Sequence, residues 1–178
     1  YILFGVTVMT PPGMIGALTH LIFHAVIKIA AFFCAGAIMH QTGRQYVHEL
    51  DGMGCKMPCV FGVFTVSALA LMGVPGLAGF ISKWNLASAA VESGNGLAYG
   101  GIVCLLVSAL LTAIYMFTIV IRAFFPGRDF EISSLEGIKD PNWKMLVPLF
   151  IFTAFIIFFG LYSGPVTRFL TDVAGGVY

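Results

Sequence analysis

Four long apolar stretches constrain this chain more than any other feature of its sequence. They cover residues 14–39, 58–91, 97–125 and 145–162. A helix rises about 1.5 Å per residue, so about 20 residues cross a hydrocarbon core that is about 30 Å thick. Only 10% of the residues are charged, whereas soluble domains carry about 25%. The sequence therefore predicts an all-α integral membrane protein with four transmembrane helices.

Polar segments separate these stretches, at residues 40–56, 92–96 and 126–144. Residues 1–9 are apolar, lack a basic region and a cleavage site, and end at a Thr-Pro-Pro-Gly sequence. We interpret them as the last turns of a helix, an N-terminal helix remnant. We expect residues 1–178 to form a single membrane domain and to be a fragment of a longer protein. The tail, residues 163–178, carries no clear signal.

Basic residues are distributed unevenly between the two predicted membrane faces. One face carries most of them, namely Arg44, Lys56, Arg122, Arg128, Lys139 and Lys144. The opposite face carries only Arg168. By the positive-inside rule the richer face is cytoplasmic, or its equivalent in an organelle, and the C-terminus lies outside. The net charge of +1 gives no basic surface for nucleic acid.

The second stretch, residues 58–91, is too long for one straight crossing. Gly73, Pro75 and Gly76 lie in its middle. Proline removes a backbone donor, and glycine loosens the backbone, so we expect a discontinuous helix that breaks at Gly73–Gly76. Irregular backbone at membrane depth occurs where it is buried in protein or lines a cavity.

Three ionisable residues follow one another at helical spacing in the first stretch. His20, His24 and Lys28 are each four residues apart, so they form a file along one helix face. An ionisable group near the bilayer centre costs about 2.5–3.5 kcal/mol on insertion scales, and such groups commonly serve proton or ion relays. Imidazole both accepts and donates protons, and burial moves the pKa of a lysine toward that of histidine. The file predicts proton transfer.

Other interpretations of these histidines exist. His20 and His24 could instead form hydrogen bonds to backbone or hydroxyl groups, and the Lys28 side chain could extend to the membrane interface. A metal site would need a third ligand in register, and haem usually takes a histidine from each of two facing helices. The remaining histidines, His40 and His48, lie at the loop. We expect neither metal nor cofactor.

Two further sets of polar residues lie inside the apolar stretches. Lys83 comes seven residues after Gly76, where exposed carbonyls and half-helix ends would form a polar pocket. We predict that Lys83 also belongs to the proton relay. In the third stretch, Ser108, Thr112 and Tyr115 recur at helical spacing and are candidates for ordering water. Small hydroxyl residues also serve as packing residues between membrane helices.

These residues lie in motifs that resemble a known family. His20-x-x-x-His24-x-x-x-Lys28 is followed by Ala-Phe-Phe-x-Ala-Gly-Ala-Ile, and Leu50-Asp-Gly-Met-Gly-Cys-Lys-Met-Pro58 lies further along. The segment Gly73-Val-Pro-Gly-Leu-Ala-Gly-Phe-Ile-Ser-Lys83 completes the set. In this order the motifs resemble the antiporter-like subunits of respiratory complex I, the Mrp-type cation/proton antiporters and membrane-bound hydrogenases. The resemblance covers about residues 1–125, and Met53 and Cys55 depart from the family pattern.

The resemblance implies the later half of a proton channel. Lys28 would match the central lysine of the second half-channel, and Lys83 the lysine on the broken helix near the outward exit. His20 and His24 would match the histidines between relay positions. The glutamate–lysine pair of the family's other half-channel is absent from this sequence.

We therefore predict translocation of protons, or exchange of Na⁺ for H⁺, by a lysine–histidine relay. The setting would be a multi-subunit redox-driven pump of the NADH–quinone oxidoreductase type or an antiporter. The expected partners are other membrane subunits and lipid, in a bacterial or archaeal cell membrane or an organelle inner membrane. No flavin, iron–sulfur or nucleotide motif is present, so we expect no catalytic residue and assign redox chemistry to partner subunits. The alternatives are a haem-binding membrane electron carrier and a structural membrane subunit.

Overall fold

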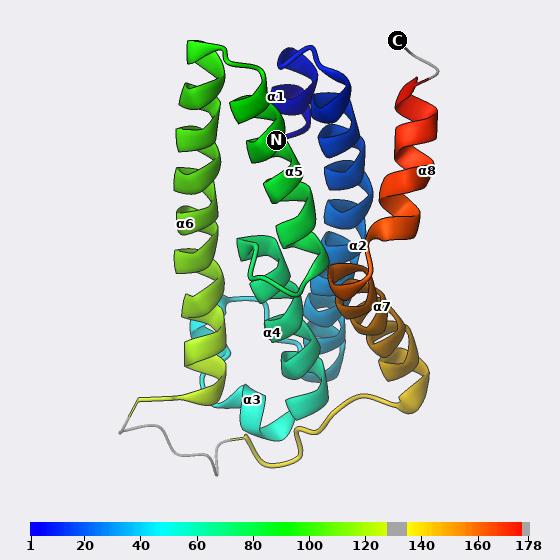
Figure 1. The fold of residues 1–178 in the computed structure, drawn as a ribbon. Helices are drawn as coiled ribbons and strands as arrows, with labels where there is room; N and C mark the ends of the chain where they lie inside the picture. Colours follow the sequence, from blue (N-terminus) through cyan, green and yellow to red (C-terminus); the bar gives the residue numbers. More distant parts are fainter. Residues whose placement is uncertain (128–134, 176–178) are drawn as a thin grey trace.

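The computed structural model describes residues 1–127 and 135–175, and within them the chain is built of helices (Figure 1). The α-helices, in chain order, are α1 (Ile2–Thr7), α2 (Pro11–Thr42), α3 (Met53–Lys56), α4 (Pro58–Met72), α5 (Ala78–Glu92), α6 (Gly96–Phe124), α7 (Trp143–Leu161) and α8 (Gly164–Gly175). A short 3₁₀ turn, η1 (Val47–Glu49), lies between α2 and α3. The all-α prediction is confirmed.

The first long helix starts earlier and ends later than the apolar stretch predicts. The Thr10 side chain accepts a hydrogen bond from the Gly13 amide, and Pro11 and Pro12 occupy the first turn of α2. Proline suits this turn because its missing N–H would have no intrahelical partner. At the other end α2 continues through three polar residues to Gly43, whose φ of 70° stops the helix. The two prolines thus begin α2 as well as separating it from α1.

The predicted discontinuous helix is confirmed as two helices, α4 and α5, joined by residues 73–77. Gly73 ends α4 with a φ of 93°, and its amide donates to Ala70 and Leu69. The Val74 amide donates to Leu69 O at 3.1 Å, which completes the pattern of a helix closed by a left-handed glycine. Pro75 follows and cannot resume the hydrogen-bond ladder. Figure 1 shows α4 and α5 one above the other, so that together they traverse the bundle.

The remaining predicted spans are present as α6 and α7, each within two residues of the expected bounds. By length and composition, α2, α6 and α7 could each cross a membrane, and α4 is a shorter apolar helix. Within the tail that carried no sequence signal, residues 164–175 form α8, which packs on α2 and contains the buried residues Leu170 and Ala174. The chain is an integral, multi-pass membrane protein.

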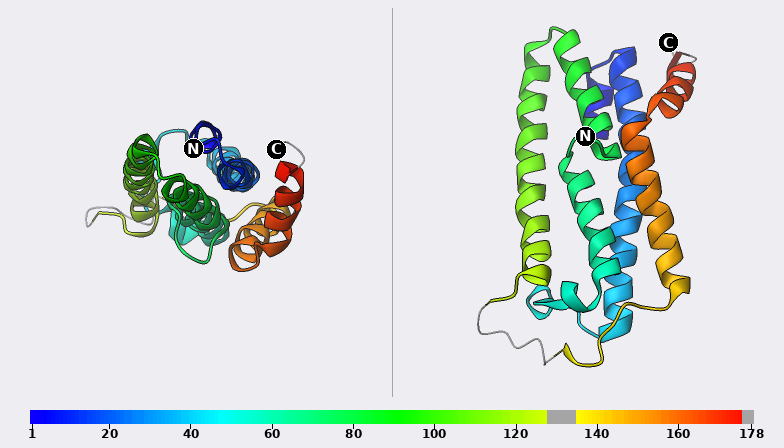
Figure 2. Two further views of the ribbon diagram at one scale, coloured as in Figure 1. Left: turned by 45° about the horizontal axis from the view of Figure 1, so that its top comes forward. Right: turned by 60° about the horizontal axis from the view of Figure 1, so that its bottom comes forward.

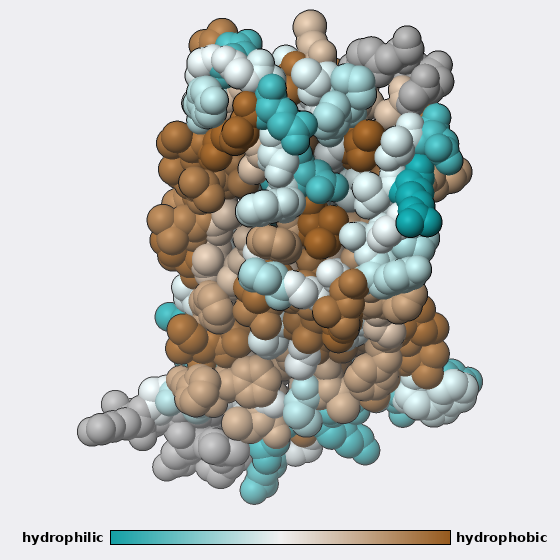
Figure 3. Space-filling model, in the orientation of Figure 1, coloured by the Kyte–Doolittle hydropathy of each residue, from teal (hydrophilic) through white to brown (hydrophobic). Residues whose placement is uncertain are grey.

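α2 lies between the α4 and α5 helices on one side and α7 and α8 on the other (Figure 2). It packs against α1, α4, α5, α7 and α8, and α4 packs in turn against α6 and α7. The largest buried side chains include Phe23, Ile27, Phe61 and Met57. The outer sides of α6 and α7 are covered with hydrophobic side chains, whereas hydrophilic residues gather over α8 and near the upper part of α5 (Figure 3).

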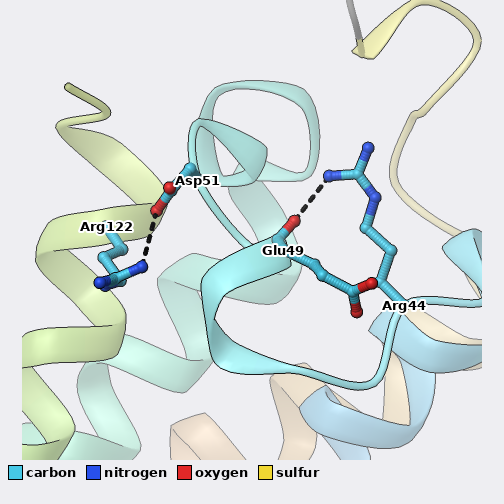
Figure 4. Close-up of polar contacts among 4 residues, drawn as sticks. All are labelled: Arg44, Glu49, Asp51 and Arg122. Atoms are coloured by element: carbon cyan, nitrogen blue, oxygen red, sulfur yellow. Dashed lines mark hydrogen bonds and ion pairs between the residues drawn. The ribbon is translucent and has the colours of Figure 1, made fainter. Parts of the chain in front are cut away.

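The loops at one end of the bundle are held together by charged residues (Figure 4). Arg44 donates from Nη1 to Glu49 O at 2.6 Å, and Arg122 pairs with Asp51 at 3.6 Å. The amides of Tyr46 and Gln45 both donate to Glu49 Oε2 at 2.9 Å and hold the pKa of that carboxyl below its ordinary value. The predicted orientation of this basic end toward the cytoplasm stays a prediction, and Arg128 lies outside the described residues.

The irregular segment between α4 and α5 is covered by α7 at a glycine. A Cβ added to Gly160 would overlap the Gly76 carbonyl oxygen and the Leu77 backbone. Only glycine therefore lets α7 approach the break this closely. Because backbone cannot move aside as a flexible side chain can, the contact depends on the absence of a side chain at this position.

We expect Gly160→Ala to lower the free energy of unfolding by about 1–3 kcal/mol, because an added methyl forces α7 away from residues 76 and 77. Thermal unfolding in detergent measures the change. Gly62→Ala on α4 is the matched control, since a Cβ there meets no atom within 4 Å and alanine favours a helix. Equal stability of the Gly160→Ala variant and the wild type would contradict the close packing.

Candidate functional site at the broken helix

The histidine face of α2 meets α5 at a buried hydrogen bond. His20 is 4% exposed and Ser82 is fully buried. The His20 Nδ1 atom lies 2.9 Å from Ser82 Oγ. The serine hydroxyl also donates to Gly79 O at 3.1 Å. This contact fixes the first histidine of the predicted file against the second half of the broken helix.

The structure confirms that the histidines lie on one face of α2. The His20 and His24 rings stack with their centroids 5.2 Å apart and an angle of 28° between their planes. Lys28 follows one turn later, near the middle of α2, and is half-buried. The file thus runs from a buried histidine to a partly accessible lysine.

Lys83 occupies the C-terminal end of α4. Its side chain is 8% exposed. The ammonium donates to Leu71 O at 2.6 Å and to Met72 O at 3.0 Å. A cation at a helix C-terminus also interacts favourably with the helix dipole. The predicted pocket at the break is therefore made of carbonyl oxygens, and Lys83 fills it.

Lys83 completes the hydrogen bonding of the α4 terminus. The last four carbonyls of a helix have no partner within it. Two of these carbonyls, Leu69 and Ala70, accept amides of the turn, and the other two accept the Lys83 ammonium. An unpaired carbonyl in a membrane interior costs several kcal/mol. Lys83 consequently has a structural role as well as any role in transport.

Glycines make room for this arrangement. A Cβ on Gly73 would lie 3.0 Å from Lys83 Cδ and 3.6 Å from Nζ, at a φ that already favours glycine. A Cβ on Gly79 would overlap the Ala70 carbonyl oxygen. The first glycine accommodates the lysine side chain, and the second lets α5 start close beside the end of α4.

Tyr1 lies between the histidine and the lysine. Its ring centroid is 4.7 Å from that of His20, and Lys83 Nζ lies 5.3 Å from the centre of the same ring. The phenol donates to Leu105 O on α6 at 3.3 Å. Tyr1 therefore connects the buried groups to the third long helix.

The predicted stripe on α6 lies apart from this cluster. Ser108 and Thr112 are half-buried and Tyr115 is exposed, and all three line a groove on α6. The Thr112 hydroxyl donates to Ser108 O at 2.8 Å. A second groove, between α1 and α6, joins Ser108 to Tyr1. The role of the stripe in ordering water stays a prediction.

The opposite end of α4 is capped by a carboxylate from a distant segment. Asp140 accepts the Cys59 amide at 3.1 Å on Oδ2 and the Val60 amide at 3.2 Å on Oδ1. Carboxylates at a helix N-terminus satisfy free amides and complement the dipole. α4 is thus held between an acidic side chain at its start and a basic one at its end.

Sequence reasoning missed three of these residues. Ser82 and Tyr1 are of types common in membrane helices, and only their contacts distinguish them. Asp140 stands 81 positions from Cys59, which is too far for any local pattern to join them. For Ser82 the sequence did offer one signal, because this residue directly precedes Lys83 in the Gly73–Lys83 motif.

The fold and the site define a multi-pass membrane protein with ionisable groups buried beside a broken helix. The chain belongs to the NADH:quinone oxidoreductase/Mrp antiporter transmembrane family, which matches residues 1–112. This match includes α1 to α5 and the first half of α6, and so all four residues of the predicted relay.

Individual relatives extend over most of the chain. It is 33% identical to an NADH-quinone oxidoreductase subunit of Desulforudis audaxviator, over 92% of this chain and 34% of that protein. It is 32% identical to a Na(+)/H(+) antiporter subunit of Bacillus subtilis, over 97% of this chain and 34% of that protein. The chain therefore spans about a third of the length of these relatives.

Solved structures share the fold. The Mrp complex from Dietzia contains a chain with a TM-score of 0.85 at 23% identity, covering 100% of this chain and 40% of that one. Respiratory complex I from Thermus thermophilus gives a TM-score of 0.74 at 22% identity, covering 97% of this chain and 35% of that one. Both of these structures are complexes.

We expect Asp140→Asn to lower the free energy of unfolding by about 1–2 kcal/mol, because one of the two α4 amides loses its acceptor and the dipole loses an anion. Thermal unfolding in detergent again measures this. Asp172→Asn on the exposed face of α8 is the control for loss of a carboxylate and should change little. Similar losses of stability in both variants would contradict the capping of α4 by Asp140.

Proposed function

We propose that this chain is the part of an antiporter-like subunit in which His20, His24, Lys28 and Lys83 relay protons through the membrane. A proton reaches Lys28 by way of the histidines and water, and Lys83 releases one to the outer face. The relay works within a larger complex, with the other half-channel and any redox chemistry supplied by the rest of the protein or by partner subunits. The family supports this function.

The observation that carries the proposal is the set of acceptors around Lys83. Both of its hydrogen-bond acceptors are neutral backbone carbonyls. A carboxylate partner would hold the lysine in its charged form, whereas carbonyls favour it less and burial opposes it. A lysine in this setting can lose its proton during a transport cycle and still donate its remaining hydrogens to the two carbonyls.

Coupling between the two lysines follows from electrostatics. Two ammonium groups about 10 Å apart in an effective dielectric of about 20 repel by about 1.7 kcal/mol. That energy corresponds to more than a tenfold change in the ratio of protonated to deprotonated lysine. At such a separation, a proton arriving at Lys28 would disfavour a second charge at Lys83 and favour release there.

We expect Lys83→Arg to lower proton flux at least tenfold while the protein stays folded. Arginine retains the charge and the donors for Leu71 and Met72 but cannot be deprotonated in proteins. Proton and sodium fluxes in vesicles that hold the complete complex provide the measurement. Lys144→Arg at the exposed start of α7 is the control. Lys83→Ala should lose stability as well as flux, because two carbonyls then lack donors.

Unchanged flux of both ions in the Lys83→Arg variant would refute the relay and leave a structural membrane subunit. A loss of flux that is accompanied by loss of the folded complex would indicate only the structural role of Lys83. The proposal thus requires an intact complex that no longer translocates.

A pair of glycine variants separates backbone strain from disturbance of the lysine. Gly73 and Gly76 have φ values of 93° and 90°, so alanine costs about 1–2 kcal/mol at either position. Only at residue 73 does the added Cβ also contact Lys83. We expect both variants to unfold at lower temperature but Gly73→Ala alone to lose most of its proton flux. Equal flux in the two variants would contradict a role for the position of Lys83.

A further inference from the structure

The hydroxyl of Ser82 has one proton and two neighbours that compete for it. Gly79 O, at 3.1 Å, is a carbonyl and can only accept. His20 Nδ1, at 2.9 Å, can donate or accept. If the hydroxyl donated to the histidine, its own oxygen would face the carbonyl lone pairs without a hydrogen between them. Both contacts are satisfied only when Ser82 donates to Gly79 and His20 donates to Ser82.

This count of hydrogens assigns the tautomer of His20. We propose that Ser82 is a positioning residue that holds neutral His20 with its proton on Nδ1, so that relayed protons enter and leave the ring at Nε2. The inference rests on the proposed function for its consequence but on the hydrogen bonds alone for the tautomer.

The same geometry rules out a path through Ser82. A proton leaving Nδ1 would have to displace the hydroxyl proton onto Gly79 O, and a peptide carbonyl oxygen is too weak a base to accept it. His20 therefore does not conduct from one ring nitrogen to the other. It takes a proton at Nε2, becomes an imidazolium whose Nδ1–H still donates to Ser82, and returns the same proton from Nε2. The bond to Ser82 strengthens while the ring is charged.

Burial of Ser82 keeps the His20 ring in this tautomer. Ser82 is 0% exposed, so no solvent competes for its hydroxyl, and Gly79 keeps the start of α5 against the end of α4. Successive helix residues differ by about 100° in direction. Ser82 accordingly contacts the histidine on α2 while the next residue, Lys83, reaches the end of α4.

The test is nitrogen NMR on the complete complex with ¹⁵N-labelled histidine, because nitrogen shifts distinguish protonated from unprotonated ring nitrogens. The His20 signals are identified by their loss in His20→Gln. We expect the wild type to carry the proton on Nδ1, Ser82→Ala to gain the Nε2–H form, and Ser82→Thr to keep the wild-type form because the hydroxyl remains. Ser88→Ala, on the same helix and half-buried, is the control and should leave His20 unchanged.

Proton flux in vesicles adds the functional readout. We expect Ser82→Ala to reduce flux about fivefold, the equilibrium factor of one typical hydrogen bond, and Ser82→Thr to restore most of it. A wild-type ring with its proton on Nε2 would overturn the inference, and that spectrum decides even if Ser82→Ala does not fold. An unchanged tautomer in Ser82→Ala would overturn it as well. If Lys83→Arg and His20→Gln transport normally, the relay fails while the spectra still decide the tautomer.

Discussion

The end of α4 lies inside the bundle, and the ammonium of Lys83 provides the hydrogen bonds that make this possible. The last four carbonyls of α4 have no partner within the helix, and the amides of the turn donate to only two of them. The other two require a donor from elsewhere in the protein. Lysine supplies several hydrogens from one atom at the end of a flexible chain. The break in the helix and the buried lysine therefore depend on each other. The lysine supplies donors for the free carbonyls, and the carbonyls supply acceptors for the ammonium.

The surrounding elements follow from this arrangement. α5 begins close beside the end of α4 because Gly79 has no side chain, and α7 covers the irregular segment because Gly160 has none. α2 packs along both halves of the broken helix and brings its histidine face to Ser82. Tyr1 places its ring beside the histidine and the lysine. A set of small residues thus brings ionisable groups from two separate helices together in the apolar core.

Much of this was accessible from the sequence, because the bilayer enforces strong rules. Apolar length located the spans, and Gly73, Pro75 and Gly76 located the break. The spacing of His20, His24 and Lys28 gave their common face. The C-terminal helix was not predicted because α8 is amphipathic and begins with a Gly-Pro pair. The partners of Lys83 were not predicted because backbone carbonyls have no sequence signature. The bond of Ser82 to His20 joins residues 62 positions apart, and only packing brings them together.

The two charged caps of α4 also set its length. Asp140 binds the amides at its start, and Lys83 binds the carbonyls at its end, each from a different part of the chain. One inserted residue would advance the helix end by about 1.5 Å and rotate it by about 100°, so that one cap would point away from its partners. α4 thus acts as a spacer of fixed register between the charged loops and the buried lysine. Substitutions within α4 keep both caps in register, whereas an insertion or a deletion does not.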